Sequence, residues 1–184
     1  GILAPKRFGG MEMDNLGLTI ALEEINRGCA STGVTLSVHN SLLSSPLLHF
    51  GTEEQQKNFF PRLASGEALG AYAITEPNHG SDAVAIETTC RRDGDDWILN
   101  GTKAWITNGS HAGIIITFAT VDPALRSKGI NAFVVESSMP GFSVGKKEKK
   151  LGIRASDTVQ LVFEDLRVPA ANLLGEEGQG FKIA

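Results

Sequence analysis

Residues 96–120 read DWILNGTKAWITNGSHAGIIITFAT and contain the clearest strand-like pattern of the chain. The runs at 96–100 and 102–107 are short and rich in apolar, aromatic and β-branched residues, and a longer apolar run fills 112–120. Both patterns are typical of β-strands. Asn100-Gly101, between the first two runs, is a residue pair strongly favoured in two-residue hairpin turns. We therefore predict a β-hairpin at this point, followed by a buried third strand.

Similar short runs lie on both sides of this stretch. Further strands are expected at 69–75, 84–92, 130–136 and 158–163, separated by Gly, Pro, Asn and Asp residues. No helical periodicity separates these runs, so the pattern predicts an antiparallel β-barrel or sandwich of about seven strands. This middle β domain is expected to span residues 69–174.

The first 68 residues follow a helical period instead. Asp14 is a candidate N-cap for a helix that ends at Gly28, and a second helical stretch is expected over 30–44. Thr52 and Gln55 form a capping box for a third helix. The predicted fold class is α+β, with a partial N-terminal helical domain at 1–68 before the β domain. Residues 175–184 are expected to begin a C-terminal helical domain that is otherwise missing, since so short a helix is unstable alone.

The composition excludes several classes of protein. A chain of 184 residues that is 41% hydrophobic is long enough to bury a core, and its net charge of −4 gives no reason to expect a nucleic-acid partner. The most apolar stretch, 113–119, is far shorter than the roughly 20 residues that cross a bilayer, so no membrane span is expected. The two cysteines are too few for a disulfide framework, and the four histidines lack the spacing of metal ligands.

Residues 72–82, YAITEPNHGSD, follow a predicted strand and gather hydroxyl, amide and carboxylate groups around one Pro and one Gly. Hydroxyls and exposed backbone N–H groups can bind a phosphate or the polar edge of a heterocycle. The segment contains neither a Walker loop nor the GxGxxG of a dinucleotide-binding fold. An ordinary turn whose side chains cap their own backbone remains the alternative.

Two further segments are candidates for ligand binding. In residues 105–109, WITNG, the Trp could flank a flat ring and the Thr could hydrogen-bond it, while a core Trp followed by a turn is the alternative. The basic run at 145–150, GKKEKK, could attract phosphate groups or could simply form a solvated loop.

Taken together and in order, six segments of the sequence resemble the acyl-CoA dehydrogenase family, and its short-chain (butyryl-CoA) branch in particular. The resemblance implies a flavoenzyme, usually a homotetramer, with a helical N-terminal domain, a β middle domain and a C-terminal four-helix domain. FAD would lie across the middle domain. The six segments are EEINRGCASTG (23–33), FGTEEQQKNFFPRLASGE (50–67), YAITEPNHGSD (72–82), LNGTKAWITNG (99–109), GKKEKKLGIRASDT (145–158) and VFEDLRVPAANLLGEEGQGFKIA (162–184).

The resemblance also implies roles for individual residues. The strand from Tyr72 to Thr75 would offer its backbone and the Thr75 hydroxyl to the pyrimidine edge of the flavin. Ser81 would approach both the flavin diphosphate and the acyl-CoA, and the Thr107 hydroxyl would lie near flavin N5. The full set of implied cofactor-binding residues is Tyr72, Ala73, Ile74, Thr75, Gly80, Ser81, Trp105, Ile106 and Thr107.

The implied reaction is the FAD-dependent α,β-dehydrogenation of a short-chain acyl-CoA thioester, with electrons passed to electron-transfer flavoprotein. The family's catalytic glutamate is expected beyond residue 184, so no residue of this chain is assigned as catalytic, and the chain alone is expected to be inactive. An acyl-CoA oxidase or flavin monooxygenase of the same fold, or a non-catalytic flavin- or CoA-binding module, remains an alternative. The expected location is the bacterial cytoplasm or the mitochondrial matrix.

Overall fold

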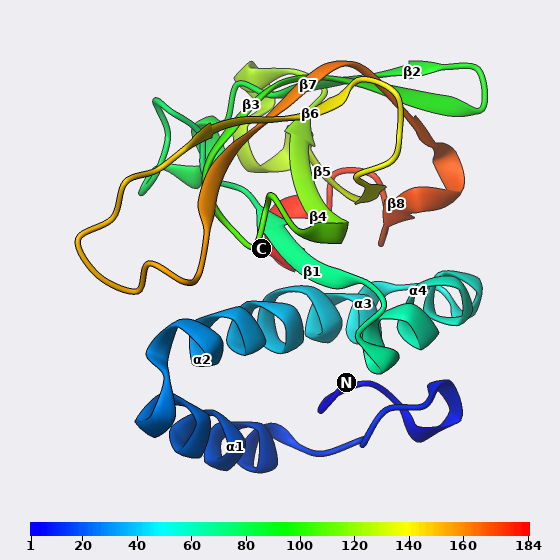
Figure 1. Cartoon of the computed structure of the whole chain (residues 1–184). Helices are drawn as coiled ribbons and strands as arrows, with labels where there is room; N and C mark the ends of the chain where they lie inside the picture. Colours follow the sequence, from blue (N-terminus) through cyan, green and yellow to red (C-terminus); the bar gives the residue numbers. More distant parts are fainter.

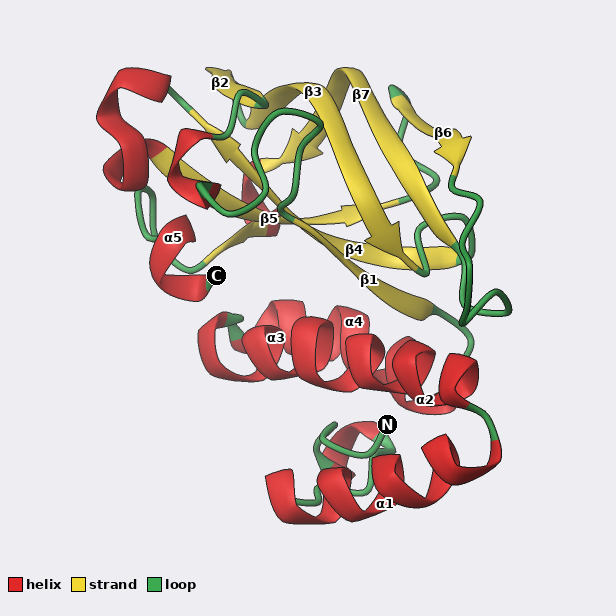
Figure 2. Cartoon of the chain, turned by 90° about the vertical axis from the view of Figure 1, so that its left-hand side faces the viewer, coloured by secondary structure: helices red, strands yellow, loops and turns green.

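The computed structural model describes residues 1–184 and has two layers, one of helices and one of strands (Figure 1). In both views the α2–α4 helices lie between α1 and the strands, with β1 nearest to them (Figure 2). None of the helices combines the length and the apolar composition needed to cross a membrane. The helices of the first layer are α1 (Asn15–Gly28), α2 (Ala30–Ser37), α3 (Ser45–Phe50) and α4 (Glu53–Ser65), and α5 (Gly180–Ile183) ends the chain.

The helix ends lie where local capping chemistry predicts them. The Asp14 side chain accepts a hydrogen bond from the backbone N–H of Gly17 and so begins α1. The predicted capping box at the start of α4 is confirmed: the Thr52 hydroxyl accepts from the Gln55 N–H, and the Gln55 side chain accepts from the Thr52 N–H. Gly66 ends α4 with a φ of 79°, a left-handed conformation that glycine adopts without strain.

The second helical stretch is longer and less regular than the sequence predicts. Helix α2 gives way to a π-helical segment, η2 (Val38–Ser44), and helical structure then continues through α3. Pro46 lies in the first turn of α3, where a backbone N–H has no partner within the helix. The proline, which lacks this N–H, therefore does not stop the helix.

The strands form one curled, mostly antiparallel sheet in the order β6-β7-β3-β2-β4-β5-β8, with β1 paired to β4. This agrees with the predicted α+β class, but the β1–β4 and β2–β4 pairs are parallel and correct the expectation of a wholly antiparallel domain. The strands are β1 (Leu69–Ala73), β2 (Thr89–Asp93), β3 (Asp96–Thr107), β4 (Ala112–Thr120), β5 (Ile130–Glu136), β6 (Phe142–Lys147), β7 (Thr158–Pro169) and β8 (Leu173–Leu174).

The predicted hairpin at Asn100-Gly101 is wrong, because β3 runs without reversal through both residues. Gly101 has a φ of 152°, and the pairing of β3 with β7 shifts register beside it. The freedom of this glycine is therefore used for an irregularity within a strand and not for a turn. A hairpin instead joins β2 to β3, and its turn contains Gly94, which has a φ of 62°.

Two other strand predictions need correction. The first two residues of the expected strand at 84–92 lie in a short 3-10 helix (Ala83–Ala85), and β2 begins only at Thr89. The basic run at 145–150, for which a solvated loop is one of two expectations, begins inside β6, which lies at the edge of the sheet. Lysines on an edge strand hinder its pairing with another chain, which gives these charges a structural use.

The core has two parts, and β4 belongs to both. Ile114, Ile116 and Phe118 point toward the helices, where they pack with residues such as Leu43 and Phe60. Ile115 and Ala119 point the other way into the barrel, among residues such as Phe133 and Leu161. Burial on both faces explains why the sequence of β4 is a continuous apolar run and not an alternating one.

Candidate functional site

The two segments that the sequence singles out lie side by side. The backbone N–H of Ala104 in β3 donates to the carbonyl of Thr75, just after β1, at 2.8 Å. This bond places residues 72–76 alongside residues 103–107, although 29 positions separate Thr75 from Ala104 in the sequence (104 − 75 = 29). A ligand that contacts one segment is therefore within reach of the other.

A buried ion pair holds these two segments together. The Lys103 ammonium lies 2.7 Å from a Glu76 carboxylate oxygen, and the residues are 0% and 3% exposed. Lys103 Nζ also donates to the Ile74 carbonyl at 3.3 Å. The Glu76 carboxylate accepts from the backbone N–H groups of Glu87 at 2.6 Å and Thr88 at 3.0 Å. The pair thus fixes the chain leaving β1 against both β3 and the start of β2.

The environment of this pair shifts both pKa values. Burial lowers the pKa of Lys103 to about 8, with the Glu76 carboxylate opposing that shift. For Glu76, burial alone would raise the pKa, but the Lys103 charge and the hydrogen bonds from Thr88 and Glu87 lower it below its ordinary value. Both groups therefore stay charged at neutral pH. Glu76 is accordingly an ionised carboxylate enclosed by donors and is not a free base facing a ligand.

Thr75 offers a backbone donor with no partner in the chain. Its carbonyl accepts from Ala104, but its N–H makes no hydrogen bond to any backbone or side-chain acceptor. The residue is partly exposed, at the end of a buried strand. Because backbone N–H groups are almost always paired, a free one in this position is a ready site for a ligand acceptor.

Trp105 is held in an unusual conformation. Its φ is 62°, in the left-handed region that a bulky residue rarely adopts, and its side chain is 61% exposed. The structure thus excludes the alternative of a core Trp and presents the indole to the outside. Strain of this kind occurs most often where a residue serves a function.

The neighbours of Trp105 differ from it in exposure. Ile106 is 2% exposed and packs in the barrel core, so its side chain does not reach a ligand. Thr107 is partly exposed at the end of β3, opposite Thr158 of β7. Sequence reasoning missed Asn108, a buried residue whose side-chain N–H₂ donates to the carbonyls of Thr35 at 3.2 Å and Gly70 at 3.0 Å. An Asn that follows a strand and precedes a Gly was the available signal.

The remaining predicted residues divide into side chains that pack inward and side chains that face solvent. The Tyr72 ring lies 5.1 Å from that of Phe118, and burial raises the pKa of its hydroxyl to about 12. Ala73 is buried in the barrel core. Gly80 and Ser81 lie on an exposed loop after the turn at 76–79, in which backbone bonds join Glu76 and His79.

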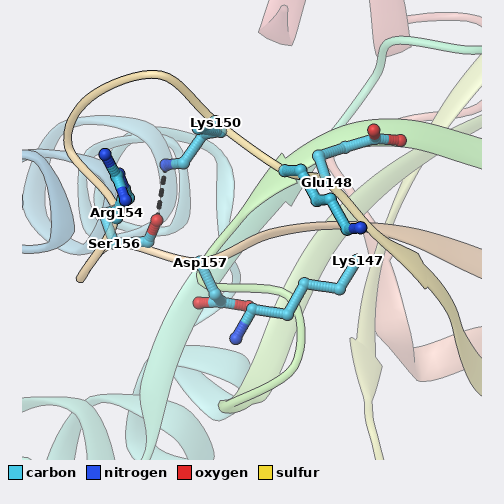
Figure 3. Close-up of a pocket in the computed structure, with 7 residues that line it drawn as sticks. Lys147, Glu148, Lys150, Arg154, Ser156 and Asp157 are labelled. Atoms are coloured by element: carbon cyan, nitrogen blue, oxygen red, sulfur yellow. Dashed lines mark hydrogen bonds between the residues drawn. The ribbon is translucent and has the colours of Figure 1, made fainter.

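The basic run lines a separate cavity of about 310 Å³ (Figure 3). Lys150 Nζ donates to the Ser156 carbonyl, as Figure 3 shows, and the Asp157 carboxylate accepts from the backbone N–H and the hydroxyl of Ser110 at 3.0 and 2.6 Å. The carboxylates of Glu148 and Asp157 offset part of the positive charge. The lining residues are Lys147, Glu148, Lys149, Lys150, Arg154, Ser156 and Asp157.

Comparison with known proteins identifies relatives of both parts of the chain. Residues 1–67 match the family model of the acyl-CoA dehydrogenase N-terminal domain, and residues 71–166 match that of the acyl-CoA dehydrogenase middle domain. The short-chain specific acyl-CoA dehydrogenase of human mitochondria is 53% identical over 187 residues, which cover 100% of this chain and 45% of the relative. The chain thus spans about half the length of the curated relatives it matches.

Solved structures give the same result. A chain in the structure of the electron transferring flavoprotein of Acidaminococcus fermentans superposes with a TM-score of 0.97 at 46% identity, covering 100% of this chain and 48% of that one. The acyl-CoA dehydrogenase of Bacillus anthracis, solved in complex with FAD, gives a TM-score of 0.92 at 40% identity, covering 100% of this chain and 31% of that one. With both domain models matched across most of its length, the chain belongs to the acyl-CoA dehydrogenase family.

Proposed function

We propose that this chain is the flavin-holding part of an enzyme that catalyses the FAD-dependent α,β-dehydrogenation of short-chain acyl-CoA thioesters. The observation that carries the proposal is the bond between Thr75 and Ala104, which sets a free backbone donor beside the exposed Trp105. The short-chain specificity is supported by the 53% identity to the human mitochondrial relative.

The residues around this bond fit a flavin. A flat ring with a polar edge needs an apolar surface for its face and hydrogen-bond donors for its rim. Trp105 supplies the first, while the N–H and hydroxyl of Thr75 and the hydroxyl of Thr107 supply the second. The implied set also includes the backbone of Tyr72, Ala73, Ile74 and Ile106 and the exposed loop at Gly80 and Ser81.

FAD, when bound, supplies the redox chemistry of the dehydrogenation. The chain's own residues bind and orient it: the Thr75 N–H donates toward the pyrimidine edge, and the Trp105 indole excludes water from the ring. Ser81 lies in the exposed loop, where its hydroxyl can donate to a diphosphate or to the acyl-CoA. The glutamate that removes the substrate's α proton is proposed to lie outside residues 1–184, since Glu76 is enclosed in its ion pair.

The partners follow from the same proposal. Electrons are proposed to pass to electron-transfer flavoprotein, a role supported by the likeness to a chain in the Acidaminococcus structure. The complete enzyme is proposed to be a homotetramer, in the bacterial cytoplasm or the mitochondrial matrix; the second location is supported by the human mitochondrial relative.

The test is an anaerobic absorbance measurement on the full-length protein reconstituted with excess FAD. We expect a bound-flavin spectrum that bleaches when butyryl-CoA is added and returns when electron-transfer flavoprotein accepts the electrons. A Trp105→Ala variant should hold FAD more weakly, and a Thr52→Ala variant, which lies in the helical layer, is the matched control. A full-length protein that retains no flavin, or whose flavin never bleaches with any short acyl-CoA, would contradict the proposal. Recovery of colour by oxygen alone would indicate an oxidase.

A further inference from the structure

The buried Lys103 makes a contact that ion pairing does not require. Its ammonium lies 3.3 Å from the Ile74 carbonyl as well as 2.7 Å from Glu76, and the residue is fully buried. Burying a lysine is unfavourable, and an apolar pair of similar volume is often as stable as a buried ion pair. Stability alone therefore does not explain why a charged residue is buried at this position.

The Ile74 carbonyl belongs to the same peptide group as the Thr75 N–H. Electrons are delocalised over the O, C and N atoms of a peptide, so a cation at the oxygen draws charge from the nitrogen and makes its hydrogen a stronger donor. This N–H is the one that makes no hydrogen bond within the chain. Lys103 is thus positioned to act on the free donor without touching a ligand itself.

Glu76 keeps the lysine charged. Burial lowers the pKa of Lys103, and the Glu76 carboxylate is the main influence that opposes this. The N–H groups of Glu87 and Thr88 in turn hold the carboxylate in place. Together these contacts form a chain of hydrogen bonds from the residues just before β2, through Glu76 and Lys103, to the Ile74 carbonyl.

We propose that Lys103 is a positioning residue that acts through the Ile74–Thr75 peptide to favour the reduced state of bound FAD. Reduction adds negative charge to the flavin, which a stronger N–H donor at the pyrimidine edge stabilises more than it stabilises the neutral oxidised ring. The inference rests on the proposed function, because it needs FAD beside Thr75. It assigns Lys103 an electrostatic role that is distinct from its role in joining β1 to β3.

The experiment compares three variants of the full-length, FAD-loaded protein. Lys103→Met removes the charge but leaves the Glu76 carboxylate buried. A Lys103→Met/Glu76→Gln double variant avoids this unpaired charge and keeps one acceptor oxygen for the N–H groups of Glu87 and Thr88. Thr117→Val is the matched control, since the Thr117 hydroxyl donates a neutral hydrogen bond to the neighbouring Ala73 carbonyl at 3.1 Å. The readouts are the dissociation constant of oxidised FAD and the two-electron reduction potential of the bound flavin.

We expect the double variant to bind reduced FAD about tenfold more weakly relative to oxidised FAD, which lowers the two-electron potential by about 30 mV. Lys103→Met should shift the potential the same way, and Thr117→Val should leave it unchanged. If the double variant binds oxidised and reduced FAD more weakly by the same factor and its potential is unchanged, the ion pair has only a structural role. That result would overturn the inference but not the proposed function. A wild-type protein that binds no FAD would overturn the inference and the proposed function together.

Discussion

Asn108 should be one of the most sensitive positions near the site, and Asn108→Ala tests this. The residue is 1% exposed and has a φ of 67°. Its side-chain N–H₂ donates to the Gly70 carbonyl of β1 and to the Thr35 carbonyl of α2. It therefore ties the end of β3 both to the neighbouring strand and to the helical layer.

The magnitude follows from these contacts. The Gly70 carbonyl is buried, and losing this donor costs about 2 kcal/mol. The Thr35 carbonyl also accepts from the Val38 N–H, so its loss adds only about 0.5 kcal/mol. Alanine in the left-handed region is about 1 kcal/mol less favourable than asparagine. We therefore expect Asn108→Ala to lower the free energy of unfolding by about 3.5 kcal/mol.

Urea denaturation of the full chain measures this change, with Asn108→Gly as the matched control. Glycine loses the same two hydrogen bonds but adopts a positive φ freely, so it should be about 1 kcal/mol more stable than the alanine variant. A loss below about 1 kcal/mol for Asn108→Ala would refute the reasoning, since it would mean that the two carbonyls find other partners. Equal stability of the two variants would refute the backbone part of the argument.

Three further predictions concern other positions. Gly101→Ala should lower the free energy of unfolding by about 2 kcal/mol or more, because a Cβ there would lie 2.7 Å from the Thr88 Cα; urea denaturation measures this, and a neutral result would contradict the crowding. Burial lowers the pKa of His39 to about 4 and its Nδ1 accepts from the Gly70 N–H, so native His39 stays neutral while the unfolded chain binds a proton. Stability should therefore fall by up to about 3 kcal/mol as the pH drops from about 6.5 to about 4, and His39→Gln should flatten that profile in pH-dependent denaturation. Trp105→Gly should weaken FAD binding in titrations yet leave the free energy of unfolding unchanged or about 1 kcal/mol higher, because it relieves the positive φ of an exposed residue; a large loss of stability would show that the indole is structural.

The helix ends could be predicted from sequence because their causes are local. Asp14 and the Thr52–Gln55 pair satisfy N–H groups three residues away, so a short stretch of sequence contains both partners of each bond. Most strand positions could be predicted too, from short runs of apolar, aromatic and β-branched residues between turn residues. The conformation of Asn100-Gly101 could not be predicted, since the same conformational freedom serves a turn or a strand irregularity. The residue that lies close to Gly101 in the fold, Thr88, is outside the segment.

The candidate site likewise has a part that the sequence predicts and a part that only the fold shows. The segments at 72–82 and 105–109 carry residue types that suit a flat, polar-edged ligand, and the sequence shows this directly. The contacts that assemble them do not appear in any local pattern, because Lys103 and Glu76 are 27 positions apart. An isolated lysine in a strand is normally an exposed residue, so its burial could be seen only once β1 and β3 were brought together.

The double burial of β4 has a consequence for how the molecule unfolds. The helical layer and the barrel use opposite faces of this one strand as their cores, so neither layer can separate without exposing Ile114, Ile116 and Phe118 or Ile115 and Ala119 to water. Two regions that match separate family models are therefore joined into a single cooperative unit. Circular dichroism of the helices and fluorescence of Trp97 inside the barrel should report one shared transition.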